Sequence, residues 1–325
     1  MEGWAIALIV IGIVLFCVLS LFVPPMFMAK KKYFELLVRT DGDKWTRRCS
    51  WPSDEEQSEM YRRGEAWAEK YADHKIDVDV YSEKLHLFGQ YFDFGSDHAV
   101  IIIPGRMEAC GYSWFFAEPY RAAGYNVLVV DNRAHGLSEG KDNSLGKHEH
   151  KDVIEWAKLL REKFGVKAIF LHGICIGSST AAYALTDKNC PDYVVGMAAD
   201  GMYRTFFDTF VNHLPKKNFF MTIFSLDVAF LLKLYAGVNV LTDGPIRTVK
   251  KITRPILFIH SKEDTFSAPE LGYGLYRSCP SENKRFCWFE HGRHSHLRIT
   301  DEQKYDEIVR RFITEVLTPA EKKGE

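Results

Sequence analysis

The chain has 325 residues, of which 46% are hydrophobic and 14% aromatic, which is enough to bury a large core in one α/β domain with attachments. Its 42 Lys and Arg residues balance 43 Asp and Glu residues, for a formal net charge of −1. This balance, with no basic stripe among the aromatics, gives no reason to expect a nucleic acid as partner. The cysteines are odd in number and scattered: Cys17, Cys49, Cys110, Cys175, Cys190, Cys279 and Cys287. Without a CxxC pair or metal-ligand spacing they predict free thiols in a reducing compartment, and the sequence identifies no metal or cofactor.

The N-terminus carries an apolar segment, residues 4–23, that contains no charged residue. At about 1.5 Å per residue in a helix, twenty residues can cross a hydrocarbon core roughly 30 Å thick. We expect Pro24-Pro25 to end this helix, so that residues 1–29 form a membrane anchor and residues 30–325 a separate domain. Because Lys30-Lys31-Lys32 follows the segment, the positive-inside rule predicts a single-pass cell-membrane protein whose domain is cytoplasmic.

Two alternatives to an anchor are weaker. A cleavable signal peptide needs positive charge before the apolar stretch and a small-x-small site after it, whereas Glu2 precedes this one and Phe22-Val-Pro-Pro follows it. A buried core helix is the other alternative, and the unbroken apolar character of the segment argues against it.

The next elements lead into an alternating pattern. Residues 53–71 predict a solvent-facing helix that begins with a capping box at Ser53 and Glu56. We expect its run of charged residues only to face solvent. Residues 76–80 and 85–92 predict an antiparallel pair of strands. Further strands are predicted at 99–103, 126–130, 168–171, 193–198, 256–260 and 285–289. Helices are predicted at 111–123, 147–164, 176–185, 268–278 and 301–317. This alternation indicates a mostly parallel, doubly wound sheet with ligands at the carboxyl ends of its strands.

An aromatic-rich insertion interrupts the pattern at about residues 201–252. We expect a helical lid that covers the site and supplies an apolar substrate pocket. An ordinary crossover helix with its core face is an alternative, and so is a group of aromatics that rests on the bilayer beside the anchor.

A short motif, Gly173-Ile-Cys175-Ile-Gly177, joins the strand at 168–171 to the helix after it. One residue between a strand and a helix is forced into a strained conformation and presents its side chain above the sheet, while the glycines allow close packing. This is the geometry of a nucleophile elbow with sulfur in place of a serine oxygen. Alternatively, Cys175 only fills a buried turn, and the chain is a non-catalytic, membrane-tethered binding module.

A nucleophile of this kind needs an acid and a base later in the chain. Asp264 follows a buried strand and can orient an imidazole, although it can also cap the next helix; Asp200 is the reserve acid. His294 follows the last strand and is favoured as base over His291 and His296.

Taken together, several stretches resemble the α/β-hydrolase superfamily, in particular bacterial hydrolases with one N-terminal membrane segment. The matching stretches are Ile103-Pro-Gly-Arg106, residues 129–140 with the sequence VVDNRAHGLSEG, the elbow, Ala199-Asp-Gly-Met-Tyr203, Asp264 and Gly292-Arg-His294-Ser. The resemblance implies an α/β-hydrolase fold with a helical lid, preceded by one transmembrane helix. Cysteine replaces the usual serine, and Pro104 replaces the usual histidine beside the oxyanion loop.

The resemblance also assigns roles to residues. It implies Cys175 as nucleophile, His294 as base and Asp264 as orienting acid. The oxyanion hole would be formed by the backbone N–H groups of Ile176 and of Arg106 or Met107. Arg133 and His135 would brace the loop after their strand.

A cysteine nucleophile narrows the chemistry. Beside an imidazole and a helix N-terminus a cysteine can be a thiolate at neutral pH, and sulfur attacks activated acyl groups well. The arrangement is similar to dienelactone hydrolases and some acyl-CoA-dependent acyltransferases. We therefore expect a small-molecule ester or thioester with an apolar acyl part to be hydrolysed through an acyl-cysteine, or an acyl group to be transferred from it. Acyl chain length, leaving group and oligomeric state remain open.

Overall fold

The computed structural model describes residues 3–40, 45–213 and 218–317. An eight-stranded sheet forms its centre, in the order β1-β2-β4-β3-β5-β6-β7-β8. The strands are β1 Lys75–Ser82, β2 Leu85–Phe92, β3 His98–Ile103, β4 Asn126–Val130, β5 Ala168–Ile174, β6 Val194–Asp200, β7 Ile256–Ser261 and β8 Lys284–Phe289. β1 and β2 are antiparallel to each other, β2 is antiparallel to β4, and all later pairs are parallel. The mostly parallel sheet with an antiparallel lead-in is thereby confirmed.

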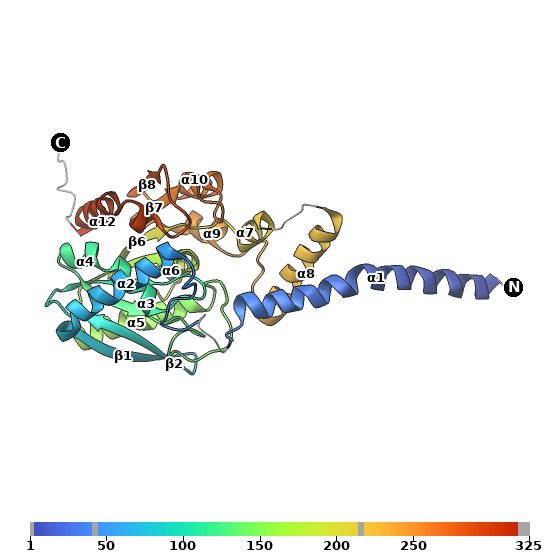
Figure 1. Ribbon diagram of the computed structural model, residues 1–325, viewed down its shortest axis with the longest axis horizontal. Coiled ribbons are helices and arrows are strands. Elements are labelled where there is room, and N and C mark those ends of the chain that lie inside the picture. The colour runs from blue at the N-terminus through green and yellow to red at the C-terminus, as the bar shows by residue number, and fades with distance from the viewer. Residues whose placement is uncertain (1–2, 41–44, 214–217, 318–325) are drawn as a thin grey trace.

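Helices cover both faces of the sheet (Figure 1). They are α2 Glu55–Lys70, α3 Cys110–Ser113, α4 Glu118–Ala122, α5 Glu149–Phe164, α6 Ile176–Thr186, α10 Pro269–Ser278, α11 Leu297–Thr300 and α12 Glu302–Leu317. Alternate residues of a strand point to opposite faces, so β3 feeds two cores. Val100 and Ile102 pack in the core that α12 covers, while Ile101 and Ile103 pack in the core that α5 covers.

The helix predicted over residues 111–123 is wrong as a single element. The structure has α3, a 3₁₀ turn at Trp114–Phe116 and α4 in its place. Pro119 has no N–H with which to reach the carbonyl four residues earlier, that of Phe115. The Arg298 guanidinium donates to this carbonyl instead.

The capping box predicted at Ser53 and Glu56 is also wrong, by one residue. Asp54 is the N-cap of α2, and its carboxylate accepts a hydrogen bond from the Gln57 amide at 3.1 Å. Asp and Ser cap helices about equally well, so local preference does not choose between them.

The N-terminal helix α1 extends over Gly3–Leu37 and continues through Pro24-Pro25, so the prediction that these prolines end it is wrong. A proline inside a helix costs about 3 kcal/mol. The part of α1 after the prolines gains compensating contacts, because Ala29, Tyr33 and Leu37 are buried against the domain. The part before them is apolar, unburied and long enough to cross a membrane.

The insertion after β6 is helical, as predicted, with α7 Phe206–Asn212, α8 Phe219–Tyr235, α9 Pro245–Thr248 and a 3₁₀ turn at Val249–Lys251. α8 leans against α1 where α1 joins the domain (Figure 1), and Tyr235 stacks on Tyr33 with ring centroids 5.4 Å apart. One side of α8 is buried, but Phe219 and Phe220 on its first turn are 65% and 62% exposed. An ordinary crossover helix does not account for these exposed aromatics.

Candidate functional site

The turn between β5 and α6 has the geometry of a nucleophile elbow. Cys175 has φ 53° and ψ −112°, a conformation that a residue with a side chain rarely adopts. A Cβ at Gly173 would lie 2.3 Å from the Gly177 carbonyl oxygen, and a Cβ at Gly177 would lie 2.1 Å from the Ile103 carbonyl oxygen. The flanking glycines are therefore required for strand and helix to approach this closely.

Backbone hydrogen bonds fix this turn against the neighbouring strand. The Cys175 amide donates to the carbonyl of Asp200 at 2.9 Å, and the Ser178 hydroxyl donates to the carbonyl of Gly173 at 2.6 Å. With these bonds in place, the Cys175 side chain lies at the wall of a cavity at the carboxyl edge of the sheet.

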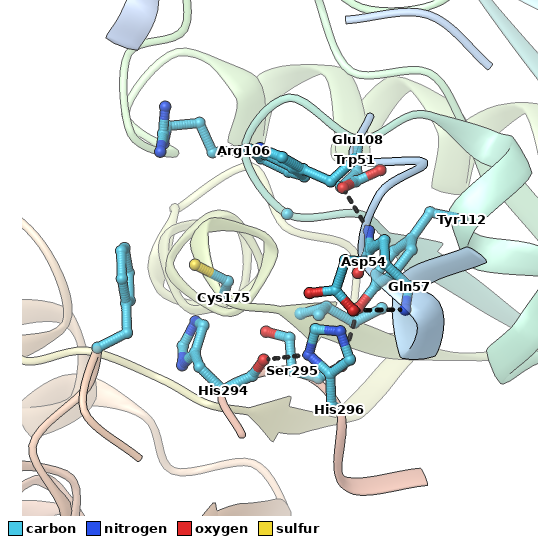
Figure 2. Close-up of a pocket in the computed structure, with 13 residues that line it drawn as sticks. Trp51, Asp54, Gln57, Arg106, Glu108, Tyr112, Cys175, His294, Ser295 and His296 are labelled. Atoms are coloured by element: carbon cyan, nitrogen blue, oxygen red, sulfur yellow. Dashed lines mark hydrogen bonds between the residues drawn. The ribbon is translucent and has the colours of Figure 1, made fainter. Parts of the chain in front are cut away.

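Asp264 and His294 reach the same place from the loops after β7 and β8. The His294 Nδ1 and the Asp264 Oδ2 are 2.7 Å apart, and the other carboxylate oxygen accepts the amides of Phe266 and Ser267. Figure 2 shows His294 beside Cys175 in the cavity wall. The His294 Nε2 is buried and has no hydrogen-bond partner among the described residues, so it is free to exchange a proton with a neighbouring group.

Charge interactions set the protonation of this pair. Burial would lower the pKa of His294, but Asp264 and Cys175 outweigh it and raise that pKa well above its ordinary value. Burial likewise works to raise the pKa of Asp264, yet the charge and hydrogen bond of His294 leave that pKa below its usual range. The geometry favours an ionised Asp264 that holds the imidazole with its Nε2 toward the cavity.

The other two histidines of this loop are placed differently. His291 is exposed and pairs with Glu263 at 2.9 Å. His296 directs its Nδ1 to the carbonyl of His294 at 2.8 Å. Neither has a carboxylate partner at the cavity in the part of the chain that the structure describes.

Asp200, the reserve acid, lies behind the elbow. Tyr305 donates its hydroxyl to the Asp200 carboxyl at 2.7 Å, and burial raises the pKa of Asp200 to about 7. This carboxyl forms no hydrogen bond with His294 among the described contacts.

The loop after β3 passes over the elbow. A Cβ at Gly105 would lie 3.5 Å from the Cβ of Cys175, so this loop contacts the elbow. The Met107 amide donates to Nε2 of His135 at 3.2 Å, whereas the amides of Arg106 and Ile176 have no acceptor within the described ranges. Of the two alternatives for the oxyanion hole, only Arg106 has a backbone N–H that is not already hydrogen-bonded within the described residues.

His135 and Arg133 are expected to brace the loop after their own strand, β4, and His135 also reaches the loop after β3. His135 accepts from Met107 through Nε2 and donates through Nδ1 to the Arg133 carbonyl at 2.8 Å, and burial lowers its pKa to about 4. Arg133 forms a two-pronged ion pair with Asp152.

Residues that the sequence did not single out form the roof of the cavity. The segment before α2 and its first turn contribute Trp51, Asp54 and Gln57, and the loop after β3 contributes Glu108 (Figure 2). Gln57 donates to Glu108 at 2.8 Å, and Tyr61 also bonds that carboxyl. Burial raises the pKa of Glu108 to about 8. A buried carboxyl beside a site is not recognisable from local sequence, because its burial depends on a segment about fifty residues away.

The first turn of α2 is also bound to the histidine loop. The Arg293 guanidinium makes a two-pronged ion pair with Asp54, at 2.7 and 2.8 Å, and bonds Glu56 at 2.7 Å. The expectation that these charged residues only face solvent is therefore wrong for Asp54 and Glu56.

The fold matches that of known proteins. A family model described as alpha/beta hydrolase fold matches residues 98–219. The Pyrococcus furiosus esterase Pf2001 is similar with a TM-score of 0.63 at 22% identity, over 76% of this chain and 93% of that one. The chain has the fold of the α/β hydrolases. An alpha-beta hydrolase from Vibrio vulnificus is also similar to it, with a TM-score of 0.58 at 18% identity, over 84% of this chain and 98% of that one.

Two sequence relatives match part of the chain. The Bacillus subtilis protein YqkD is 30% identical over 193 residues, which are 58% of this chain and 62% of YqkD. A Saccharomyces cerevisiae protein named uncharacterized membrane protein YNL320W is 27% identical over 197 residues, 60% of this chain and 63% of that protein. The alignments span less than two thirds of either relative.

Proposed function

We propose that this α/β-hydrolase is a membrane-anchored enzyme that hydrolyses an acyl ester or thioester through an acyl-cysteine intermediate. The observation that carries the proposal is the convergence of three elements: Cys175 on the elbow, His294 with a free Nε2, and Asp264 at 2.7 Å from the other ring nitrogen. Acyl transfer by an enzyme of this type requires a nucleophile, a base close to it and an acid that orients the base.

The first step forms the acyl-enzyme. The Cys175 thiol gives its proton to Nε2 of His294, and its sulfur bonds to the carbonyl carbon of the substrate. The carbonyl electrons move to the oxygen, which the amides of Ile176 and Arg106 stabilise as an oxyanion. When the carbonyl reforms, the bond to the leaving alcohol or thiol breaks, and the His294 imidazolium protonates that group.

The second step releases the acid. His294 takes a proton from a water molecule, whose oxygen attacks the acyl carbon. The carbon–sulfur bond then breaks, and the imidazolium returns its proton to Cys175. Asp264 fixes the ring orientation and stabilises the imidazolium in both steps.

Membrane anchoring is part of the proposal. The apolar part of α1 is long enough to span a bilayer, and one relative is named a membrane protein. The three lysines at 30–32 favour a domain in the cytoplasm.

The test uses the full chain in lipid nanodiscs with p-nitrophenyl esters and acyl thioesters, and records product release and intact mass. We expect a burst and an acyl adduct that disappear in Cys175→Ala and persist in Cys287→Ala, a matched control at a cysteine outside the site. An adduct that survives Cys175→Ala, or folded wild-type protein without adduct or turnover, would contradict the proposal.

A further inference from the structure

A second cavity lies beside the first, between the N-terminal helix and the insertion. Its volume is about 500 Å³, against about 190 Å³ for the cavity at Cys175. α1, α7 and α8 supply most of its wall, which is largely apolar: Met28, Leu36, Phe206, Phe210, Met221 and Phe224. Ligand pockets in proteins are typically 300–1,000 Å³ and mostly apolar, and this cavity meets both conditions.

The two cavities share two residues, Arg106 and Phe266. The Phe266 ring lies 4.5 Å from the His294 ring on one side and 4.9 Å from the His213 ring on the other. One aromatic ring and one guanidinium therefore separate the apolar cavity from the group that we propose as the base.

Arg106 connects the N-terminal helix to the site. Its guanidinium donates to the carbonyl of Leu36, in the last turn of α1, at 3.1 Å, which also suits a cation at a helix C-terminus. The backbone amide of the same residue is a proposed oxyanion donor. The position of α1 is thus coupled both to the wall of the apolar cavity and to the loop over the thiol.

The surface next to this cavity is apolar as well. Phe219, Phe220 and Phe230 on α8 are 58–65% exposed, on the helix that packs against α1. Exposed aromatics beside a membrane-spanning segment are typical of a surface in contact with lipid. A bilayer in contact with this surface would lie against α1 and α8, two of the helices that line the cavity.

We propose that the cavity between α1, α7 and α8 binds the acyl chain of the substrate, a long chain drawn from the membrane, and that the anchor helix is one wall of this subsite. The cavity at Cys175 is too small for such a chain, so the chain extends past Phe266 and Arg106. The inference rests on the proposed function for the reacting end of the substrate, whereas binding of the chain is independent of catalysis.

The experiment measures binding without turnover. The full chain with Cys175→Ala, in nanodiscs, is irradiated with a palmitic acid analogue that carries a diazirine at mid-chain, and labelled residues are mapped by mass spectrometry. We expect labels on the cavity residues of α7, α8 and the last turns of α1, suppressed by excess palmitate.

Two substitutions on the same helix separate the cavity from the lipid-facing surface. Met221→Trp fills the cavity and should lower the palmitate-sensitive label at least fivefold. Leu226→Trp, at a position that is 48% exposed and outside the cavity, should leave it unchanged. Labels confined to the outer surfaces of α1 and α8, or equal loss in both variants, would overturn the inference.

A kinetic readout distinguishes this failure from failure of the proposed function. In the protein that retains Cys175, Met221→Trp should lower kcat/KM for a hexadecanoyl thioester about tenfold or more and that for a butanoyl thioester less than twofold. Correct labelling without turnover on any substrate would reject the hydrolase and leave the subsite intact. Turnover with no effect of Met221→Trp on chain-length preference would reject the subsite alone.

Discussion

The two sides of the cavity at Cys175 are built in different ways. On one side, Cys175, Asp264 and His294 each follow the carboxyl end of a parallel strand, and the sheet brings them together through backbone hydrogen bonds. On the other side, Trp51, Asp54 and Gln57 come from the N-terminal part of the chain, and helix α1 lines the adjoining cavity. Ion pairs and apolar contacts, rather than a strand ladder, hold that side in place.

The two sides of the cavity therefore have different roles: one carries the reacting groups, and the other determines which substrates fit. The strand-end side supplies groups that could form and break bonds, and parallel strands make their meeting place predictable. The N-terminal side determines the shape and polarity of the space above the thiol. Changes on the first side should therefore affect acylation in every substrate, and changes on the second should act through stability or substrate preference.

The largest effect is expected from the acid. Asp264→Asn should lower the single-turnover acylation rate by roughly 10³–10⁴-fold, because the amide no longer holds the imidazole in the required tautomer. Asp200→Asn should lower it less than about tenfold, since Asn still accepts from Tyr305. If Asp200→Asn were the more damaging of the two, the acid would be on β6 and not after β7.

Glu108 should make the stability of the N-terminal side pH-dependent. With its pKa raised to about 8 in the folded protein, the neutral carboxyl stabilises the fold below about pH 4.5. That contribution is lost as the pH rises through 8.

The matching measurement is the thermal unfolding of wild type and Glu108→Gln, as full chains in the same detergent, from pH 5 to pH 9. Between pH 5 and pH 9 the free energy of unfolding of the wild type should fall by a few kcal/mol relative to that of Glu108→Gln. A difference between the two proteins that stays constant with pH would show that Glu108 is already ionised at pH 5.

The smallest effect is expected from the ion pairs between α2 and the histidine loop. Arg293 is half exposed, so a double-mutant cycle of Arg293→Gln with Asp54→Asn should give a coupling of about 1 kcal/mol in stability. Asn keeps the N-cap of α2 in the cycle.

A surface pair on the same helix is the control for this cycle. Arg62 and Glu59 form an exposed pair three residues apart, and their cycle should give a smaller coupling, because solvent screens an exposed pair. Because Arg293 precedes His294, its substitution should also lower kcat/KM several-fold, while Arg62→Gln should not. Equal behaviour of the two pairs would mean that α2 merely covers the site.

By itself, the sequence determined the alternating strands and helices, the elbow with its two glycines and the order Cys175, Asp264, His294. These features depend on residues close together in the chain and on the rule that parallel strands end at one edge of the sheet. They can be predicted from the sequence because it directly contains the periodicity of the side chains, the spacing of the glycines and the order of the residues.

The remaining features depend on contacts between residues that are far apart in the chain. Pro24-Pro25 does not end α1, because burial of Tyr33 and Leu37 outweighs the local penalty. The Met107 amide donates to His135, whereas the Arg106 amide has no acceptor among the described residues. The placement of Glu108, Gln57 and α1 around the two cavities depends on contacts between residues 50 to 240 positions apart, and local preference carries no information about such contacts.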